Sequence, residues 1–339
     1  MSSFTEDDGV EEVELPPHRL MSKRPEWSDV TPTPAQLPKT PVAAPAYTEE
    51  YADMLGLLAA VQATGELSHR VLKLTASLIS YNSANYTAWD LRWHCLQRLA
   101  EEEGPAVLHE ERRYMEEIAS DNAKNYQLWN HRRKCAMAVG AAGKHEEMKF
   151  TADILLEDGK HYHAWSHRQA IVAAFGLWDI EEMYTEDLIM QDVRNNSAWN
   201  QRMFVITHNP KYEATPAREL REQEAELVKR AVSLAPGNPA PYSYLRGLYT
   251  ELRPEARLFA DGCALQVASQ ALALDPSAIP ALELLADNYA ELAADSEGGA
   301  APAASQATAL FAMLERADPI RTMYWRHRRA ELAVAGLGK

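Results

Sequence analysis

Apolar residues along the chain recur at the spacing of amphipathic helices. Leu67, Val71, Leu74 and Leu78 follow one another at intervals of four and three residues, which places them on one face of a helix. Gly and Pro interrupt this pattern between helices. Paired helices are predicted at 105–120 with 125–140, 144–158 with 161–176, and 178–192 with 195–208, and less regular helices at 216–234, 238–252, 254–274, 277–293, 303–317 and 319–335. No segment alternates as a strand does, so the pattern predicts an all-α solenoid of helical hairpins.

One motif recurs within the paired helices. Its clearest copy reads Asn-Tyr-Gln-Leu-Trp-Asn-His-Arg-Arg at residues 125–133. The Trp and an Arg three residues later occur four times, at steps of roughly 34 to 40 residues, a period typical of stacked helical pairs. These residues are Trp89, Arg92, Trp129, Arg132, Trp165, Arg168, Trp199 and Arg202. Weaker copies surround Tyr242 and Trp325.

Each residue type in the motif has a structural reason. The Asn four residues before the Trp is a good N-cap, because its side-chain oxygen accepts a hydrogen bond from the first helical turn. An indole repeated four times is too large for a surface role, so we expect it to pack between hairpins. We expect the Arg to bond a carboxylate or carbonyl of an adjacent repeat. His161 stands where the other copies have Asn, and histidine is a weaker N-cap.

Composition excludes several classes of function. The chain of 339 residues carries a net charge of −15, which argues against general nucleic-acid binding. No apolar run approaches the roughly 20 residues of a membrane span, and no signal peptide opens the chain, so we expect no membrane insertion. Cys95, Cys135 and Cys263 are widely spaced and odd in number. We therefore expect no metal site made by this chain alone and a reducing, cytoplasmic location.

The chain divides into two parts by composition. Residues 1–46 are acidic and then Pro-rich, and we expect them to be largely disordered. An island at 24–30 contains Trp27, which a wholly disordered tail would not need. Residues 47–339 form the expected helical repeat domain.

The repeated motif resembles that of protein prenyltransferase α subunits. The resemblance rests on residues 24–30, 125–133, 162–169, 192–202 and 320–326, and it covers about residues 24–335. It is nearest to the type shared by farnesyltransferase and geranylgeranyltransferase type I. The Rab-type α subunit is similar but usually longer, through inserted domains that are not evident in this sequence.

The resemblance implies a right-handed, crescent-shaped solenoid of about seven hairpins around a β subunit. That β subunit would hold the catalytic Zn²⁺, and Mg²⁺ would assist farnesyl transfer. The enzyme would transfer a farnesyl or geranylgeranyl group from its diphosphate to the cysteine of a C-terminal CaaX sequence.

The resemblance also assigns roles near the substrates. It implies that Lys124 is the catalytic lysine that reaches the diphosphate, and that Gln127 bonds the carboxylate of the peptide. The other substrate-binding residues that it implies are Tyr86, Asn125, Tyr126, Tyr162 and His163. From the pattern alone, Lys124 is more typical of a solvated loop and Gln127 of an exposed helix start, and the aromatic residues are as typical of repeat packing. We discount His163 as a metal ligand, because no second ligand stands at a suitable spacing.

A helical array also fits a second class of function, a non-catalytic scaffold that binds peptides. Such a scaffold has no reason to carry Lys124 and Gln127 in one repeat and Tyr162 with His163 in the next. A Rab-type α subunit is a third alternative. The set of four residues therefore favours the enzyme subunit.

Overall fold

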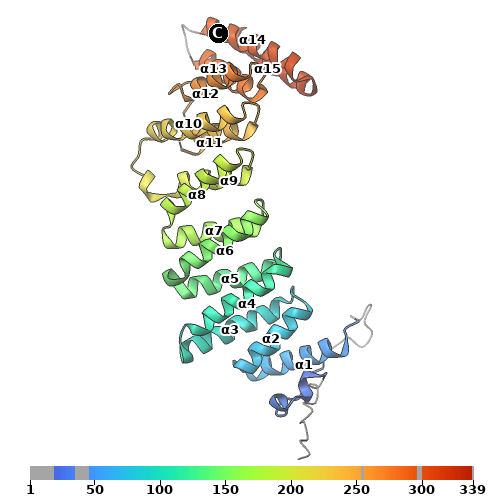
Figure 1. The fold of residues 1–339 in the computed structure, drawn as a ribbon. Coiled ribbons are helices and arrows are strands. Elements are labelled where there is room, and N and C mark those ends of the chain that lie inside the picture. The colour runs from blue at the N-terminus through green and yellow to red at the C-terminus, as the bar shows by residue number, and fades with distance from the viewer. Residues whose placement is uncertain (1–18, 35–45, 253–255, 296–299, 338–339) are drawn as a thin grey trace, which may run out of the picture. The chain divides into compact units, whose positions relative to one another are not determined.

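The computed structural model describes residues 19–34, 46–252, 256–295 and 300–337, and the regular structure in these ranges is helical (Figure 1). The chain forms two compact units that divide between His145 and Glu146. The first unit contains α1 (Glu49–Thr64), α2 (His69–Tyr81), α3 (Tyr86–Glu103), α4 (Ala106–Asn122) and α5 (Tyr126–Val139). The second begins two residues into α6 (Lys144–Glu157) and contains α7 (Tyr162–Phe175), α8 (Trp178–Gln191), α9 (Asn196–His208), α10 (Ala217–Leu234), α11 (Pro239–Leu252), α12 (Cys263–Leu274), α13 (Ile279–Asp295), α14 (Ala300–Ala317) and α15 (Thr322–Leu337).

Helices α2 to α15 pair in chain order into seven hairpins within the described residues. This agrees with the expected number. Most predicted bounds hold to within a few residues, but the helix predicted at 254–274 begins only at Cys263. Leu258 is buried although it lies in the loop before this helix. Its apolar side chain therefore extends the hydrophobic spacing beyond the start of the helix. Gly262 precedes the helix with φ 77°, a backbone conformation that glycine adopts without strain.

The predicted Asn caps are present at the second helices. The side chains of Asn85, Asn125 and Asn195 accept hydrogen bonds from backbone N–H groups in the first turns of α3, α5 and α9. His161 caps α7 in the same way, because its Nδ1 accepts from the Ala164 N–H at 3.2 Å. The expected weakness of histidine as a cap therefore does not prevent α7 from starting at the equivalent position.

The repeated Trp residues are buried in the core, as expected. Each indole N–H also donates to the carbonyl oxygen six residues earlier, for example Trp129 to Ala123 at 2.6 Å and Trp199 to Val193 at 3.0 Å. In the weaker fifth copy, the Tyr242 hydroxyl donates to the Pro236 carbonyl at 2.7 Å over the same offset. The aromatic residue thus ties the turn before each second helix to the hairpin core.

Part of the predicted disordered segment has a defined structure. Trp27 is 2% exposed and lies under the Arg70 guanidinium of α2, which is 4.9 Å from the ring centre. The Thr33 N–H donates to the Gly56 carbonyl of α1 at 2.9 Å. Residues 19–34 therefore pack on α1 and α2, and they include the island at 24–30 that the sequence sets apart from the largely disordered segment. The rest of the predicted segment, 1–18 and 35–45, lies outside the described residues.

Candidate functional site

The arginine of the first motif copy forms a buried bridge between hairpins. Arg92 on α3 donates from Nε and Nη2 to the two carboxylate oxygens of Glu111 on α4, at 2.7 and 2.6 Å. Its Nη1 donates to the Leu72 carbonyl at 2.7 Å and to the Thr75 hydroxyl at 3.2 Å, both on α2. The expectation that this Arg bonds a carboxylate or a carbonyl of an adjacent repeat is confirmed by Glu111, while the Leu72 carbonyl belongs to its own hairpin. The paired geometry makes this a strong, charge-assisted contact.

Glu111 also holds the second helix of its own hairpin. The distance from His131 Nε2 on α5 to Glu111 Oε1 is 2.7 Å, and both side chains are buried. Burial lowers the pKa of His131 and outweighs the opposing effect of Glu111. Burial alone would raise the pKa of Glu111, but the hydrogen bond from His131 and the charge of Arg92 outweigh it and lower that pKa. A neutral imidazole therefore donates to a charged carboxylate.

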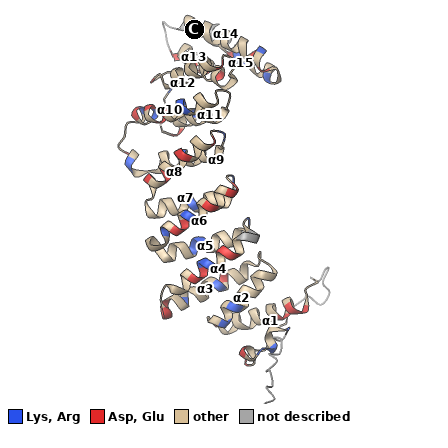
Figure 2. Ribbon diagram, viewed as in Figure 1, with Lys and Arg blue, Asp and Glu red and all other residues tan. Residues whose placement is uncertain are grey.

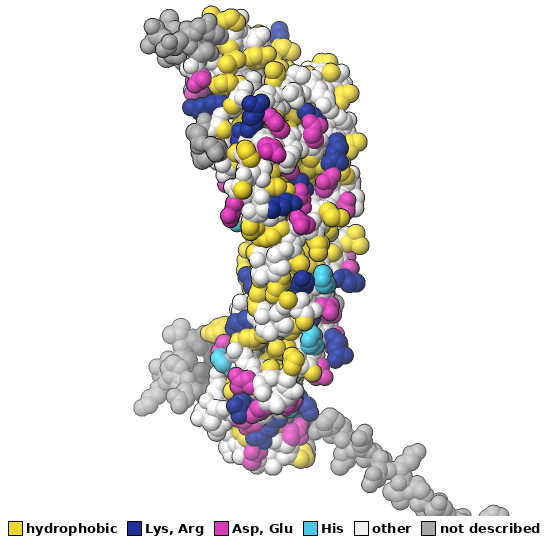
Figure 3. All heavy atoms as spheres, turned by 90° about the vertical axis from the view of Figure 1, so that its left-hand side faces the viewer, with side chains coloured by type: hydrophobic (Ala, Val, Ile, Leu, Met, Phe, Trp, Pro, Cys, Tyr) yellow, Lys and Arg dark blue, Asp and Glu magenta, His cyan; other side chains and the backbone are white. Residues whose placement is uncertain are grey.

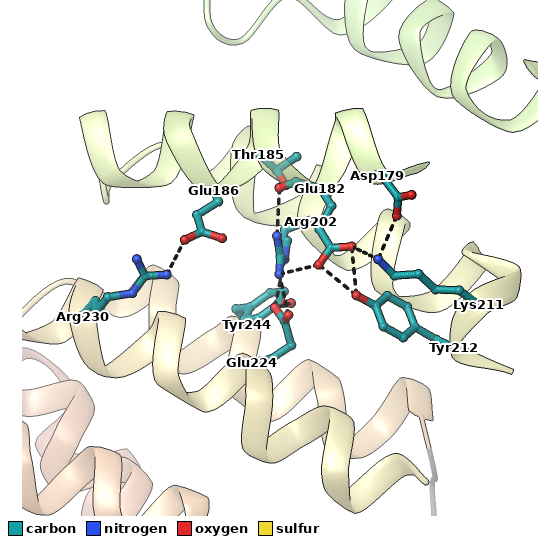
Figure 4. Close-up of polar contacts among 10 residues, drawn as sticks. All are labelled: Asp179, Glu182, Thr185, Glu186, Arg202, Lys211, Tyr212, Glu224, Arg230 and Tyr244. Carbon is teal, nitrogen blue, oxygen red and sulfur yellow. Dashed lines mark hydrogen bonds and ion pairs between the residues drawn. The ribbon is translucent and has the colours of Figure 1, made fainter. Parts of the chain in front are cut away.

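The same bridge recurs in the second unit with other donors. Arg168 Nε and Gln201 Nε2 both donate to Glu181 on α8, at 2.8 and 2.6 Å. Further along, Arg202 Nη2 and the Tyr244 hydroxyl both donate to Glu224 on α10, at 2.5 and 2.6 Å (Figure 4). Burial raises the pKa of Tyr244 well above its ordinary value, so its hydroxyl stays a donor. These bridges fix successive second helices, which carry the candidate site residues.

Sequence reasoning missed the glutamates and their second partners. A signal was present, because the glutamate stands 20 residues before its partner in every case. The four pairs are Glu111 with His131, Glu147 with His167, Glu181 with Gln201, and Glu224 with Tyr244.

The first turn of α5 presents the predicted catalytic and peptide-binding residues. Lys124 is exposed in the turn immediately before the helix. Asn125 caps the helix by accepting from the Gln127 N–H at 2.7 Å, and its own amide donates to the Ser83 carbonyl at 2.7 Å. Tyr126 is 68% exposed, which argues against a packing role for its side chain. A cation beside a helix N-terminus is an arrangement that favours a bound anion.

The other predicted residues lie at the starts of α3 and α7. Tyr86 is 70% exposed as the first residue of α3, and Tyr162 is 64% exposed as the first residue of α7. The ring of His163 lies against Tyr162, with the ring centres 5.0 Å apart. Within the first unit the structure therefore brings Tyr86, Lys124, Tyr126 and Gln127 to the N-terminal ends of α3 and α5. Tyr162 and His163 occupy the equivalent end of α7 in the second unit.

A pocket of 270 Å³ opens between α3 and α5. Its lining includes the predicted substrate-binding residues Tyr86 and Gln127 and the repeat residue Trp89. The other lining residues are Thr87, Asp90, Asn130, His131 and Lys134. His131 therefore links the pocket to the buried Arg92–Glu111 bridge. Of these side chains, Asp90 and Lys134 carry the charges and were not predicted as site residues.

Charges elsewhere are distributed without strong separation. Figure 2 shows basic and acidic residues on the same or neighbouring helices, and Figure 3 shows them interspersed on the face that it draws. Among the described residues, no group of three His, Cys, Asp or Glu side chains is placed to hold a metal ion. In that same part of the chain, no helix has both the length and the apolar character needed to cross a membrane.

Comparison with known proteins places these features in a family. The model of the protein prenyltransferase alpha subunit repeat matches residues 68–99, 108–138, 144–175 and 178–209. The chain is 39% identical to the protein farnesyltransferase/geranylgeranyltransferase type-1 subunit alpha of Pisum sativum, over 96% of this chain and 98% of the relative. It is 36% identical to the Arabidopsis thaliana protein of the same name, over 94% and 98%. A solved structure titled Candida albicans protein geranylgeranyltransferase-I complexed with GGPP has a chain that is 27% identical and superposes with a TM-score of 0.71, covering 90% of this chain and 98% of that one.

The matched repeats define the class, a helical solenoid of prenyltransferase α-subunit repeats. The chain belongs to the family of protein farnesyltransferase/geranylgeranyltransferase type-1 α subunits. The expected resemblance and all-α repeat fold are confirmed. The handedness and the crescent shape of the solenoid stay predictions.

Proposed function

We propose that this chain is the α subunit of a heterodimeric protein prenyltransferase. The heterodimer transfers a farnesyl or geranylgeranyl group from its diphosphate to the cysteine of a C-terminal CaaX sequence. The observation that carries this proposal is the α5 start, where Lys124 and Gln127 lie on a helix N-terminus that the Asn125 cap and the Glu111 bridge hold in place. The relatives named above support it, because they align over nearly the whole chain.

In the proposed reaction the sulfur of the substrate cysteine attacks C1 of the isoprenoid, a new C–S bond forms, and the C1–O bond to diphosphate breaks. Negative charge grows on the departing diphosphate, and the Lys124 ammonium stabilises it, assisted by the N-terminal end of α5. Lysine suits this role as a mobile point charge. Gln127 orients the peptide by binding its terminal carboxylate, and Tyr86, Asn125, Tyr126, Tyr162 and His163 line the substrates.

A metal ion enters this proposal only through the partner. A Zn²⁺ ion on the β subunit would keep the substrate cysteine as a thiolate at neutral pH, and Mg²⁺ would offset diphosphate charge during farnesyl transfer. Cys95 and Cys263 of this chain are poorly suited to bind a metal ion as thiolates, because burial raises the pKa of Cys95 to about 11 and that of Cys263 to about 12. We place the heterodimer in the cytoplasm, a reducing compartment that suits three cysteines of which none forms a disulfide.

The proposal is tested by reconstitution. The chain is co-purified with candidate β subunits, and transfer of labelled farnesyl and geranylgeranyl diphosphate to a CaaX peptide is measured. We expect activity that requires both chains and zinc. Failure to form a complex with any β subunit would instead favour the peptide-binding scaffold.

A further inference from the structure

The pocket between α3 and α5 is lined by a cation, Lys134, for which the described part of the chain supplies no ion-pair partner. Lys134 lies on α5, half-buried, with its Nζ 5.9 Å from the centre of the Trp93 ring. Within the described residues, no carboxylate lies within the 4.0 Å of an ion pair with it, whereas Arg92 on α3 is paired with Glu111. An aromatic face compensates only part of the cost of partial burial. The pocket therefore favours an incoming negative charge.

The opposite wall carries a carboxylate, so the two charges must be weighed. Asp90 on α3 has a side chain that is 63% exposed, and its Oδ2 is 3.6 Å from His94 Nδ1 on its own helix. Water screens an exposed charge strongly, while a half-buried charge acts through a lower effective dielectric constant. The pocket lining also includes groups that can donate hydrogen bonds to a carboxylate, the amides of Gln127 and Asn130 and the hydroxyl of Thr87. The recognition chemistry of the pocket is thus that of a carboxylate receptor.

We propose that this pocket receives an acidic side chain of the partner β subunit and thereby fixes the register of α3 and α5 on it. This inference rests on the heterodimer of the proposed function. The partner fits better than the substrate peptide for a geometric reason. Lys134 follows Gln127 by seven residues, about 10 Å along the helix, so a peptide whose terminal carboxylate is bound by Gln127 has no second terminus to place there. A carboxylate held at Lys134 would set specificity and register, as charged pairs in partly desolvated interfaces do.

Removing the charge from each wall of the pocket in turn should change the affinity for the β subunit in opposite directions. Three purified variants, Lys134→Met, Asp90→Asn and the control Lys73→Met, are titrated with wild-type β subunit, and the dissociation constant is measured at low and high salt. Methionine keeps an unbranched apolar side chain on this helix face while removing the charge. Lys73 is an exposed lysine on α2, outside the pocket. The KM for a CaaX peptide is measured separately at saturating β subunit, and the melting temperature of each free α subunit reports folding.

We expect Lys134→Met to weaken assembly by about tenfold or more at low salt, with a smaller loss at high salt. Asp90→Asn should tighten assembly. Lys73→Met should change neither the dissociation constant for the β subunit nor the KM for the peptide. The proposal is overturned if Lys134→Met assembles as wild type does, or if it raises only the KM for the peptide, which would make the substrate the occupant. The opposite signs for the two pocket variants would also overturn it, because they indicate a cationic occupant. Wild-type chain that fails to bind any β subunit would instead contradict the proposed function itself.

Discussion

Arg92 and Glu111 form a bidentate ion pair in the interior of the first unit, with both Arg92 donors within 2.7 Å of the carboxylate oxygens. Glu111 is also the acceptor for His131, so one carboxylate holds α3 and α5 to α4. The consequences of this arrangement for stability and for the site can be measured.

Replacing Glu111 by Leu should destabilise the chain by about 3–5 kcal/mol, because it leaves the Arg92 charge buried without its partner. The exposed Glu101→Gln is a control on the neighbouring α3, where we expect a change within about 0.5 kcal/mol. Chemical denaturation followed by circular dichroism measures both. Equal effects for the two variants would show that the buried bridge does not stabilise the fold.

Trp129→Ala should cost about 3–5 kcal/mol through the cavity that it leaves. Trp129→Tyr should cost less, because the Tyr242 hydroxyl already forms the equivalent bond to a carbonyl six residues earlier. The melting temperatures of the two variants compare these costs. An unchanged melting temperature for Trp129→Ala would remove Trp129 from the core.

Stability should fall as pH decreases from 7 toward 5, in part because of His131. Burial lowers the pKa of His131 below its ordinary value of 6.5, so the unfolded state binds a proton more readily than the folded state. Stability from this residue is therefore present above pH 6.5 and is lost as the pH falls toward the lowered pKa, by up to about 1.4 kcal/mol per pH unit.

His131→Gln should flatten this pH dependence while keeping the hydrogen bond. Gln201 already donates to Glu181 at the equivalent place at 2.6 Å, so glutamine is compatible with the bridge. Denaturation midpoints between pH 5 and 8 measure the difference. A variant with the same slope as wild type would show that another group titrates there.

Gln127→Ala should raise the KM for a CaaX peptide by about tenfold, with a smaller change in kcat, because it removes a binding contact to the peptide carboxylate. Gln97→Ala, an exposed residue on α3, is the control. A peptide with an amidated C-terminus provides the second comparison. If Gln127→Ala weakens the amidated peptide as much as the free acid, Gln127 does not recognise the carboxylate.

Much of the fold could be predicted from the sequence because its determinants are local. Asn125 as a cap, Trp129 as a core residue and Arg92 as a partner of a neighbouring repeat all follow from a motif of nine residues. The start of α12 could not be predicted, because the buried loop residue Leu258 continues the apolar spacing.

The candidate site was predictable only where a resemblance existed. The pocket that joins Asp90 to Lys134 depends on how α3 packs beside α5, which no local pattern specifies. Glu111 is one of several glutamates in α4, and which of them faces Arg92 is a property of the packed hairpins. Lys124 is a candidate only through its place in the family motif, since the pattern alone is typical of a solvated lysine.

The most direct test of the account is the rate of the chemical step in an assembled heterodimer carrying Lys124→Ala. Lys160→Ala is the matched control, because Lys160 is exposed and occupies the same place before the cap of α7. Single-turnover transfer to a CaaX peptide is measured with both substrates bound. We expect Lys124→Ala to slow this step by about a hundredfold while the complex still forms, because a cation beside the departing diphosphate is lost. We expect Lys160→Ala to react as wild type does. A Lys124→Ala heterodimer with the wild-type single-turnover rate would contradict the catalytic role and leave this chain as a scaffold for its partner.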